Sequence, residues 1–297
     1  MNRRETLAGF AAGAACSFLL GRGSAAAAQS ESGNRMSKWA YSTEGFDRIV
    51  HRIDGIETVT YAIGDGEALV YFHGGGTFHG FEWARALANH FRVYAPYHPN
   101  FGESGDAPFD QMADYVAHYE MLFPALGLDT FHLAGASMGG HMAARYAAAN
   151  PGDIDKLVLN AAAGLKSDQA QVGAFGQVAP DQIRFMFVTD PAWIEPYWPT
   201  NPTPEWQALR DREQRAAFAS REDADATDRA LRQGLKGFDR PTLLLWGEKD
   251  KVVPPSFVQE WQEVLPEAEV AMIPNGSHLL LDEFPAAVEA LRNFLKA

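Results

Sequence analysis

The sequence predicts an α/β fold, which is a doubly wound, mainly parallel sheet flanked by helices, with a helical cap insertion. Short apolar or β-branched runs alternate with longer amphipathic stretches from Arg48 onward, and this alternation is typical of parallel strands joined by helices. Several runs are almost continuously apolar, as expected for strands that are covered on both faces. The alternation breaks between about Gly164 and Phe238, which predicts an insertion at about residues 165–236.

The predicted strands and helices follow directly from this alternation. The strands are Thr58–Ile63, Ala68–Phe72, Arg92–Ala95, Thr130–Ala134, Lys156–Asn160, Thr242–Trp246 and Glu269–Ile273. The helical patterns lie at Phe81–His90, Asp110–Leu126, Met138–Ala149, Pro255–Leu265 and Pro285–Lys296. Because helical stretches separate most of these strands, we expect crossover connections and a parallel sheet.

The predicted insertion differs in composition from the rest of the chain. It lacks strand signals, is rich in proline and tryptophan, and carries a strongly charged helical run at Glu205–Leu235. Its aromatic side chains are expected to line a pocket or, alternatively, to form a small core of the insertion itself. These aromatic residues are Phe185, Phe187, Trp193, Tyr197, Trp198 and Trp206.

Composition and charge narrow the possible functions. The chain has 297 residues, of which 46% are hydrophobic and 21% are charged, and this composition suits a globular protein with a large core. The formal charge of −13 argues against a nucleic-acid partner, because phosphate binding needs clustered lysine and arginine. The single cysteine, Cys16, excludes an intrachain disulfide framework and any multi-cysteine metal site. Enzymes and small-molecule binding proteins fit this composition best.

Residues 1–28 have the pattern of a secretory signal peptide. Paired arginines precede the apolar run Ala8–Leu20, and a small-residue cleavage site ends at Ala28, as in twin-arginine export signals. The run is too short for a permanent membrane span, which needs about 20 apolar residues. We therefore expect an exported, periplasmic protein with the mature domain at residues 29–297. The alternatives are a buried N-terminal helix and acylation of Cys16.

A candidate nucleophile follows the fourth predicted strand. The segment Gly135–Gly140 contains G-x-S-x-G between a strand and a helical run, so Ser137 lies on a tight strand-to-helix turn. Gly135 and Gly139 have no Cβ atoms to obstruct such a turn. The turn would raise the Ser137 hydroxyl above the sheet and direct the backbone N–H of Met138 toward developing negative charge.

A serine nucleophile needs a base and a carboxylate that orients this base. Asp250 lies in the loop after the strand Thr242–Trp246, and His278 lies in the loop after the last predicted strand. Both loops are at carboxyl ends of strands, where doubly wound sheets place their sites. We therefore predict a catalytic triad of Ser137, Asp250 and His278.

Other carboxylates and histidines are weaker candidates for the triad. Glu248 is closer to the strand end than Asp250 is, and Asp282 is expected to cap the last helix. His132 lies within a strand and is expected to be structural. His90 and His118 lie on helical patterns, where we expect them to face solvent or to cap a helix.

A glycine loop, His73–Thr77, follows the second predicted strand. Without side chains in the way, a backbone N–H of this loop can face a substrate oxygen. We expect Gly75, with Gly76 as the second choice, to form an oxyanion hole together with the N–H of Met138. His73 is expected to hold the loop by hydrogen bonds and not to transfer protons.

These motifs resemble the α/β-hydrolase fold superfamily over residues 40–297, including its chain order of serine, aspartate and histidine. The matching segments are His73–Gly76, Ala95 to Ser104, Gly135–Gly140, Gly247–Asp250 and Gly276–His278. Within the superfamily, the chain is most similar to the cap-bearing branch of carboxylesterases, meta-cleavage product hydrolases, epoxide hydrolases and haloalkane dehalogenases. The last two classes use a nucleophilic aspartate, which Ser137 excludes.

The chain departs from the family pattern in two loops. Tyr97 stands where the family usually has aspartate and Asn100 where it has a glycine, although asparagine tolerates the positive φ of such a turn. The dipeptide Thr77-Phe78 stands where many cap-bearing relatives have Pro-Gly, which disfavours the meta-cleavage hydrolases.

The triad and the resemblance together predict acyl transfer to water. We expect a serine hydrolase that cleaves a carboxylic ester of an apolar or aromatic small molecule, with no metal or organic cofactor. Hydrolysis of a C–C bond or an amide on the same triad is the alternative within the enzyme class. A non-catalytic ligand-binding protein of the same fold is the alternative from another class.

Overall fold

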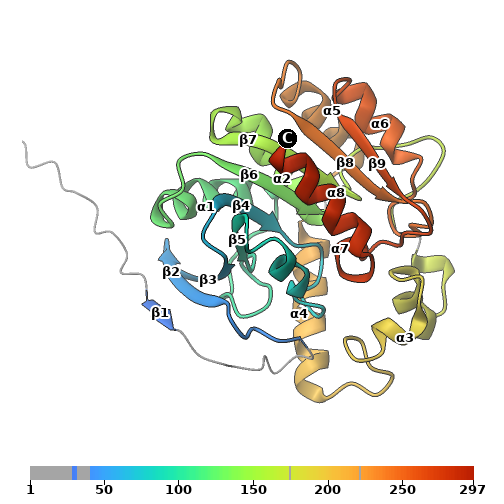
Figure 1. Cartoon of the computed structure of the whole chain (residues 1–297). Helices are drawn as coiled ribbons and strands as arrows, with labels where there is room; N and C mark the ends of the chain where they lie inside the picture. The colour runs from blue at the N-terminus through green and yellow to red at the C-terminus, as the bar shows by residue number, and fades with distance from the viewer. Residues whose placement is uncertain (1–28, 32–40, 174, 221) are drawn as a thin grey trace, which may run out of the picture.

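A computed structural model describes residues 29–31, 41–173, 175–220 and 222–297 of the chain. Over these residues its central feature is a nine-stranded sheet (Figure 1). The strands are β1 (Gln29–Glu31), β2 (Asp47–Ile53), β3 (Ile56–Ile63), β4 (Glu67–Phe72), β5 (Phe91–Pro96), β6 (Phe131–Ala136), β7 (Ile154–Asn160), β8 (Thr242–Gly247) and β9 (Glu269–Ile273).

The order of the strands across the sheet is β1-β2-β3-β5-β4-β6-β7-β8-β9. All neighbours from β5 to β9 pair in parallel, whereas β1, β2 and β3 pair antiparallel with their neighbours. The predicted α/β fold with a mainly parallel sheet is therefore confirmed. The strands β1 and β2 are additions to it, since the alternation of the sequence does not predict them.

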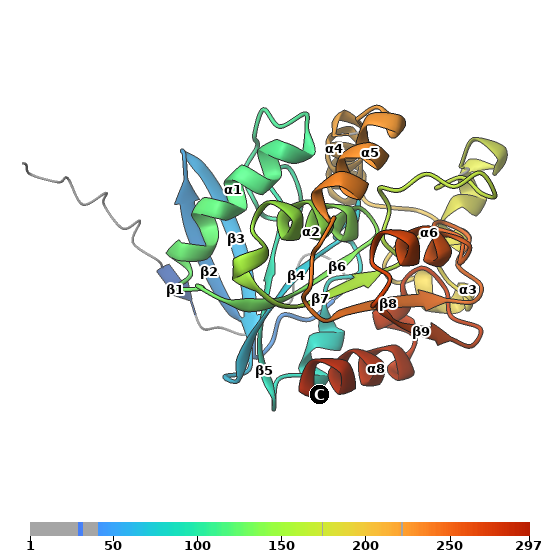
Figure 2. The ribbon, with the colours of Figure 1, turned by 90° about the horizontal axis from the view of Figure 1, so that it is seen from above.

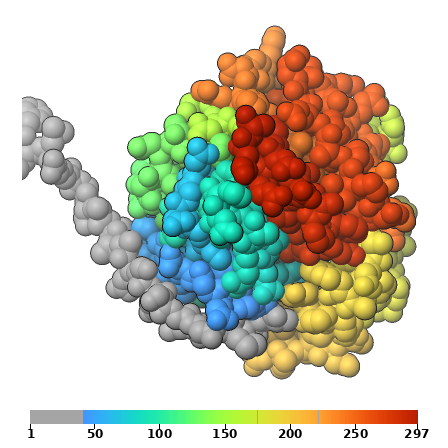
Figure 3. Space-filling view, in the orientation of Figure 1, coloured from blue at the N-terminus to red at the C-terminus, as the bar shows by residue number. Residues whose placement is uncertain are grey.

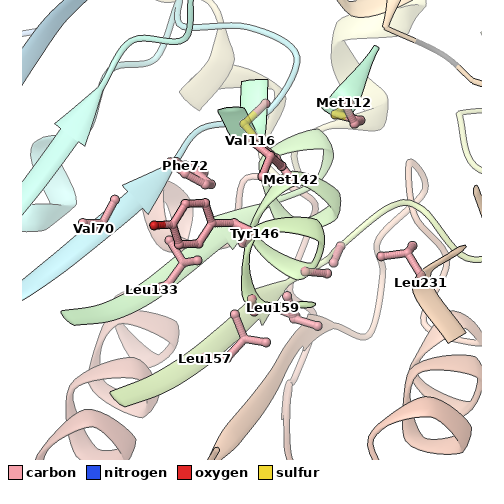
Figure 4. Close-up of a cluster of buried hydrophobic side chains, with 14 of the residues drawn as sticks. Val70, Phe72, Met112, Val116, Leu133, Met142, Tyr146, Leu157, Leu159 and Leu231 are labelled. Atoms are coloured by element: carbon pink, nitrogen blue, oxygen red, sulfur yellow. The ribbon is translucent and has the colours of Figure 1, made fainter. Parts of the chain in front are cut away.

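Helices cover both faces of the sheet (Figure 2). On one face lie α1 (Met112–Ala125), α2 (Met138–Ala149) and α6 (Phe257–Val264), and on the other lie the 3₁₀ helix η1 (Glu82–Ala86) and α8 (Pro285–Lys296). Figure 4 shows part of the core under α1 and α2, where strand and helix side chains meet. Its labelled residues are Val70, Phe72, Met112, Val116, Leu133, Met142, Tyr146, Leu157, Leu159 and Leu231.

The predicted helix at Phe81–His90 is wrong in type and length. Only η1 forms there, and turns lead from it into β5. The N–H of Leu87 donates to the carbonyl of Ala84, and the N–H of His90 donates to that of Leu87, so the hydrogen bonds close after three residues. The buried residues of this segment end only a few residues before β5 begins. The chain therefore enters β5 through tight turns instead of a regular α-helix.

The segment between β7 and β8 is a helical insertion, as predicted. It contains the 3₁₀ helices η3 (Phe175–Gln177) and η4 (Pro180–Met186) and the α-helices α3 (Pro191–Ile194), α4 (Pro204–Ala219) and α5 (Ala224–Gly234). The side chains of Thr203 and Asp223 cap α4 and α5, which divides the charged run into two helices. In the space-filling view the yellow part of the insertion lies against the red C-terminal segments (Figure 3).

The predicted signal peptide at residues 1–28 and Cys16 within it lie outside the described residues. In the part of the chain that is described, no helix is long and apolar enough to cross a membrane.

Candidate active site

Ser137 lies on the turn between β6 and α2 with φ of 55° and ψ of −117°. A positive φ is uncommon for a residue with a side chain and is retained where the surrounding structure enforces it. Here the N–H of Ser137 donates to the carbonyl of Asn160 (3.0 Å), and its carbonyl accepts from the N–H groups of His141 (3.1 Å) and Ala163 (3.0 Å). The main chain on both sides of Ser137 therefore holds the turn in place.

Gly135 and Gly139 make this turn sterically possible. A Cβ atom on Gly135 would lie 2.2 Å from the carbonyl oxygen of Gly139, and one on Gly139 would lie 2.2 Å from the carbonyl oxygen of Phe72. Both contacts are with backbone atoms, which cannot move aside as a flexible side chain does. The turn therefore accepts only glycine at these two positions without a backbone shift.

We expect Gly139→Ala to lower the free energy of unfolding by about 1–3 kcal/mol, because the added methyl overpacks the turn. Urea unfolding followed by circular dichroism measures this change. Gly152→Ala is the matched control, since a Cβ atom on Gly152 meets nothing within 4 Å. Equal unfolding free energies for the two variants would contradict the steric account of the turn.

Asp250 and His278 are in direct contact. The Nδ1 atom of His278 lies 2.8 Å from Oδ2 of Asp250, and both side chains are buried. The other carboxylate oxygen of Asp250, Oδ1, accepts from the N–H groups of Val252 (2.8 Å) and Val253 (2.9 Å). Since Nδ1–H donates to Asp250, the Nε2 atom of His278 is left to act on substrate or nucleophile.

Ser137 and His278 line the same cavity, which has a volume of about 620 Å³. Among the described residues, no hydrogen bond joins the Ser137 hydroxyl to the imidazole, and such contacts often tighten only when substrate is bound. Met138 is the first residue of α2, so its N–H has no acceptor within the helix. The structure thus brings Asp250 and His278 together and leads Ser137 and Met138 to the same cavity.

The alternative carboxylates have other partners. Glu248 is exposed, and its Oε2 atom accepts from the N–H of Asn275 (3.1 Å). Asp282 lies in α7 (Leu280–Glu283), where its Oδ2 atom is 3.2 Å from Nδ1 of His79. The expectation that Asp282 caps the last helix is therefore wrong, because α8 has no side-chain cap and the Asp282 carboxylate faces His79. No motif in the sequence predicts this pair.

The glycine loop also lines the cavity, with Gly74, Gly75 and Gly76 all at its wall. Gly74 is next to the nucleophile turn, since a Cβ atom built on it would lie 3.3 Å from Cβ of Ser137. An oxyanion donor from this loop is thus sterically feasible, and Gly75 stays our predicted donor. Within the described residues, no cluster of three His, Cys, Asp or Glu side chains is arranged to hold a metal ion.

The insertion supplies part of the apolar cavity wall. Phe187 and Trp198 line the cavity together with Ser137, and the Phe187 ring lies 5.6 Å from the His278 imidazole. Trp193 and Tyr197 instead line a second cavity of about 550 Å³. The prediction that the aromatic residues line a pocket is therefore confirmed for these four, which divide between two cavities. Phe185 and Trp206 line neither cavity, and the buried Trp206 packs against Trp198, as the alternative of a small core expects.

One acidic residue that the sequence analysis does not single out fastens the insertion to the histidine loop. Glu283 accepts from the N–H groups of Thr189 (2.9 Å) and Asp190 (2.6 Å) and from the hydroxyl of Ser277. Ser277 precedes His278, so Glu283 links the cap and the candidate base. Glutamate following a leucine run is common in helices, and only the fold brings these groups together.

His73 and His98 form a buried polar pair behind the glycine loop. Nδ1 of His73 donates to the carbonyl of Gly74 (2.7 Å), and its Nε2 accepts from the N–H of His98 (3.0 Å). Nε2 of His98 donates in turn to the carbonyl of His73 (2.9 Å). Because Nε2 of His73 accepts, this ring is neutral, and burial favours the neutral form of His98 by lowering its pKa. The prediction that His73 holds the loop by hydrogen bonds is confirmed.

Two other predictions about side chains have opposite outcomes. Asn100 adopts φ of 73°, which confirms that asparagine keeps the turn in place of glycine. His118 is buried against β3, with Nε2 2.8 Å from the Thr58 hydroxyl, so the prediction that it faces solvent or caps a helix is wrong. Its side of α1 packs on the sheet. His90 is exposed and His132 is buried, as expected.

Buried histidines should make the protein sensitive to acid. Burial lowers the pKa of His98 to about 3 and holds the pKa of His73 well below its ordinary value of 6.5. Below pH 6.5 these histidines bind protons in the unfolded chain but stay neutral in the folded chain. Their contribution to the free energy of unfolding is therefore fully present above pH 6.5 and is lost as the pH falls toward the folded-state pKa values.

We therefore expect the free energy of unfolding to fall by up to about 1.4 kcal/mol per pH unit for each such histidine between pH 6 and pH 4. Urea unfolding across this range measures the slope. His98→Gln should reduce the slope, and the exposed His90→Gln is its control. A wild-type stability that does not change from pH 7 to pH 4 would contradict the neutral buried pair.

Comparisons with known proteins agree with the fold. A family model described as alpha/beta hydrolase fold matches residues 67–285. Lipase 1 of Psychrobacter immobilis is 26% identical over 272 residues, which cover 82% of this chain and 85% of the lipase. The 2-hydroxy-6-oxo-6-phenylhexa-2,4-dienoate hydrolase of Comamonas testosteroni is 28% identical over 217 residues, covering 64% of this chain and 74% of that enzyme. A solved bacterial membrane phospholipase A aligns with a TM-score of 0.64 at 25% identity, covering 85% of this chain and 86% of its own.

Proposed function

The chain belongs to the α/β-hydrolase fold family, and from this premise we propose that it is a serine hydrolase that cleaves carboxylic esters through an acyl-enzyme on Ser137. One observation carries the proposal. The buried Asp250–His278 pair and the strained turn of Ser137 lie at a single apolar cavity. A nucleophile, a base and an orienting carboxylate at one cavity are the parts that acyl transfer requires.

The proposed reaction has two stages. His278 takes the proton of Ser137 as its oxygen attacks the ester carbonyl, and Asp250 stabilises the resulting imidazolium. The N–H groups of Met138 and Gly75 stabilise the oxyanion, and the alcohol leaves with the proton from His278. Water, deprotonated by His278, then attacks the acyl-enzyme and releases the acid.

Esters are favoured over other substrates by the cavity and by the relatives. Apolar side chains, among them Leu165, Phe187 and Trp198, line much of the cavity and suit an apolar acyl or alcohol group. The lipase and the phospholipase A are named for ester hydrolysis. Because the chain is also similar to the Comamonas hydrolase, C–C bond hydrolysis is the second candidate reaction.

Model substrates with one common acyl group test the reaction class. We expect the p-nitrophenyl ester to be hydrolysed with a higher kcat/KM than the matching anilide or a vinylogous diketone, and a fluorophosphonate to label Ser137. A preference for the diketone would replace esterase with C–C hydrolase. Absence of both turnover and labelling would favour a binding protein.

We also propose that residues 1–28 are a cleaved export signal, on the sequence pattern alone. Protein recovered from a periplasmic fraction should have a mature chain that begins at Gln29. A chain that retains Met1 in that fraction would contradict this.

A further inference from the structure

A buried ionic cluster joins the insertion to the glycine loop. Glu213 lies in α4 and is fully buried, and Arg210, one turn earlier, donates from Nη1 to its Oε2 atom (2.8 Å). The rest of the cluster comes from the sheet domain. Glu213 accepts from the N–H of Thr77 (3.3 Å), from the hydroxyl of Thr77 and from the N–H of Gly102 (3.2 Å). Both carboxylate oxygens are thus used by groups far away in the sequence.

Thr77 is the residue that directly follows Gly74–Gly76. Its N–H and its hydroxyl both donate to Glu213, and proline at this position would supply neither donor. The departure from the Pro-Gly pattern thus coincides with the presence of a buried acceptor on α4. Glycine has no side chain that could hold the loop in place. The two hydrogen bonds from Thr77 to Glu213 are therefore a main restraint at this end of the loop.

Arg210 restrains the same loop from the cavity side. Its guanidinium carbon lies 4.8 Å from the centre of the Phe78 ring and 4.9 Å from that of Trp198, and these contacts fix its position. A Cβ atom on Gly76 would lie 2.1 Å from Nη1 of Arg210, so the guanidinium lies directly against the Gly76 backbone. The helix α4 therefore contacts two consecutive residues of the glycine loop.

We propose that Glu213, with Arg210 as its partner, is a positioning residue that fixes the Gly74–Gly76 backbone and thereby the oxyanion donor. The insertion then controls the rate of the chemical step in addition to forming part of the pocket. This role rests on the proposed function, because it presumes that a loop N–H stabilises the oxyanion. A shift of about 1 Å in such a group can lower a rate by about 10²-fold.

The test replaces Glu213 with glutamine, which keeps the shape of the side chain but loses one acceptor and the charge. We expect kcat for a p-nitrophenyl ester to fall by about 10- to 100-fold while KM changes by less than about threefold. Glu205→Gln is the matched control, because Glu205 is exposed in the first turn of the same helix. It should leave both constants unchanged.

A thionoester substrate distinguishes a positioning role of Glu213 from general damage to the fold. Sulfur is a weak hydrogen-bond acceptor, so a misplaced oxyanion donor should slow the oxygen ester more than the matching thionoester. Thr77→Val, which keeps the N–H and loses only the hydroxyl, should show the same selective effect at smaller size and serves if the glutamine variant does not fold.

Equal losses with the oxygen ester and the thionoester, or a wild-type kcat in Glu213→Gln and Thr77→Val, would overturn the positioning role while the proposed function stands. An inactive wild-type protein that a fluorophosphonate does not label would overturn the proposed function, and this role with it.

Discussion

Replacing Ser137 with alanine is expected to lower kcat for ester hydrolysis by about 10⁶-fold, which is the size of effect expected when a serine nucleophile is removed. The reason is that no other hydroxyl is expected to attack the carbonyl next to the His278 base. The turn itself should persist, since main-chain atoms make the hydrogen bonds to Asn160, His141 and Ala163. Steady-state kinetics with a p-nitrophenyl ester measure the loss, and circular dichroism checks the fold.

Ser220→Ala is the matched control for this prediction. Ser220 also lines the cavity and is buried, but its hydroxyl contacts the carbonyl of Ala217 (3.3 Å) and the sulfur of Met138 (4.0 Å), and within the described residues it has no hydrogen bond to a histidine. We expect this variant to keep a kcat close to that of the wild type. A Ser137→Ala protein with more than about one tenth of the wild-type kcat would contradict the assignment of the nucleophile.

Asp250→Asn is expected to lower kcat by about 10⁴-fold, with little change in KM. An amide cannot stabilise the imidazolium of His278, and its NH₂ group can force the ring into the wrong tautomer. The loop should keep its backbone, because the amide oxygen can still accept from the N–H groups of Val252 and Val253. Kinetics across a pH range measure both constants.

The other acidic residues serve as controls for Asp250. Glu248→Gln should be close to wild type, because this side chain is exposed and, within the part of the chain that is described, accepts only from the N–H of Asn275. Asp282→Asn removes the charge beside His79 without touching the Asp250–His278 pair. A loss of kcat in Asp282→Asn as large as that in Asp250→Asn would contradict the choice of carboxylate.

Local sequence patterns predict much of the fold. The strands β4 to β9 are short apolar runs, and α2 and α8 have the bounds that their helical patterns predict. The strand β2 is missed because it mixes charged and apolar residues and its first four residues are only half-buried, so it lacks the continuous apolar run of a strand covered on both faces. The prediction of an α-helix around η1 is wrong because the conformation of that segment depends on the turn into β5, which helical periodicity does not reveal.

The candidate site likewise contains residues that sequence motifs predict and one residue that they do not. Ser137, Asp250 and His278 can each be proposed from a short motif at the end of a strand, because a parallel sheet brings such ends together. Glu213 cannot, because a glutamate in a charged helical run normally faces solvent. Its donors, Thr77 and Gly102, are more than a hundred residues away in the chain. Only the packing of α4 on the glycine loop reveals that pairing.

The acyl-enzyme is the central claim, and its direct test is mass spectrometry of enzyme quenched in acid during turnover of a slowly hydrolysed ester. We predict one added acyl group, on the peptide that contains Ser137, which forms at least as fast as the steady-state turnover. Steady ester hydrolysis with an unmodified Ser137 peptide, or an acyl group located on another residue, would contradict the account.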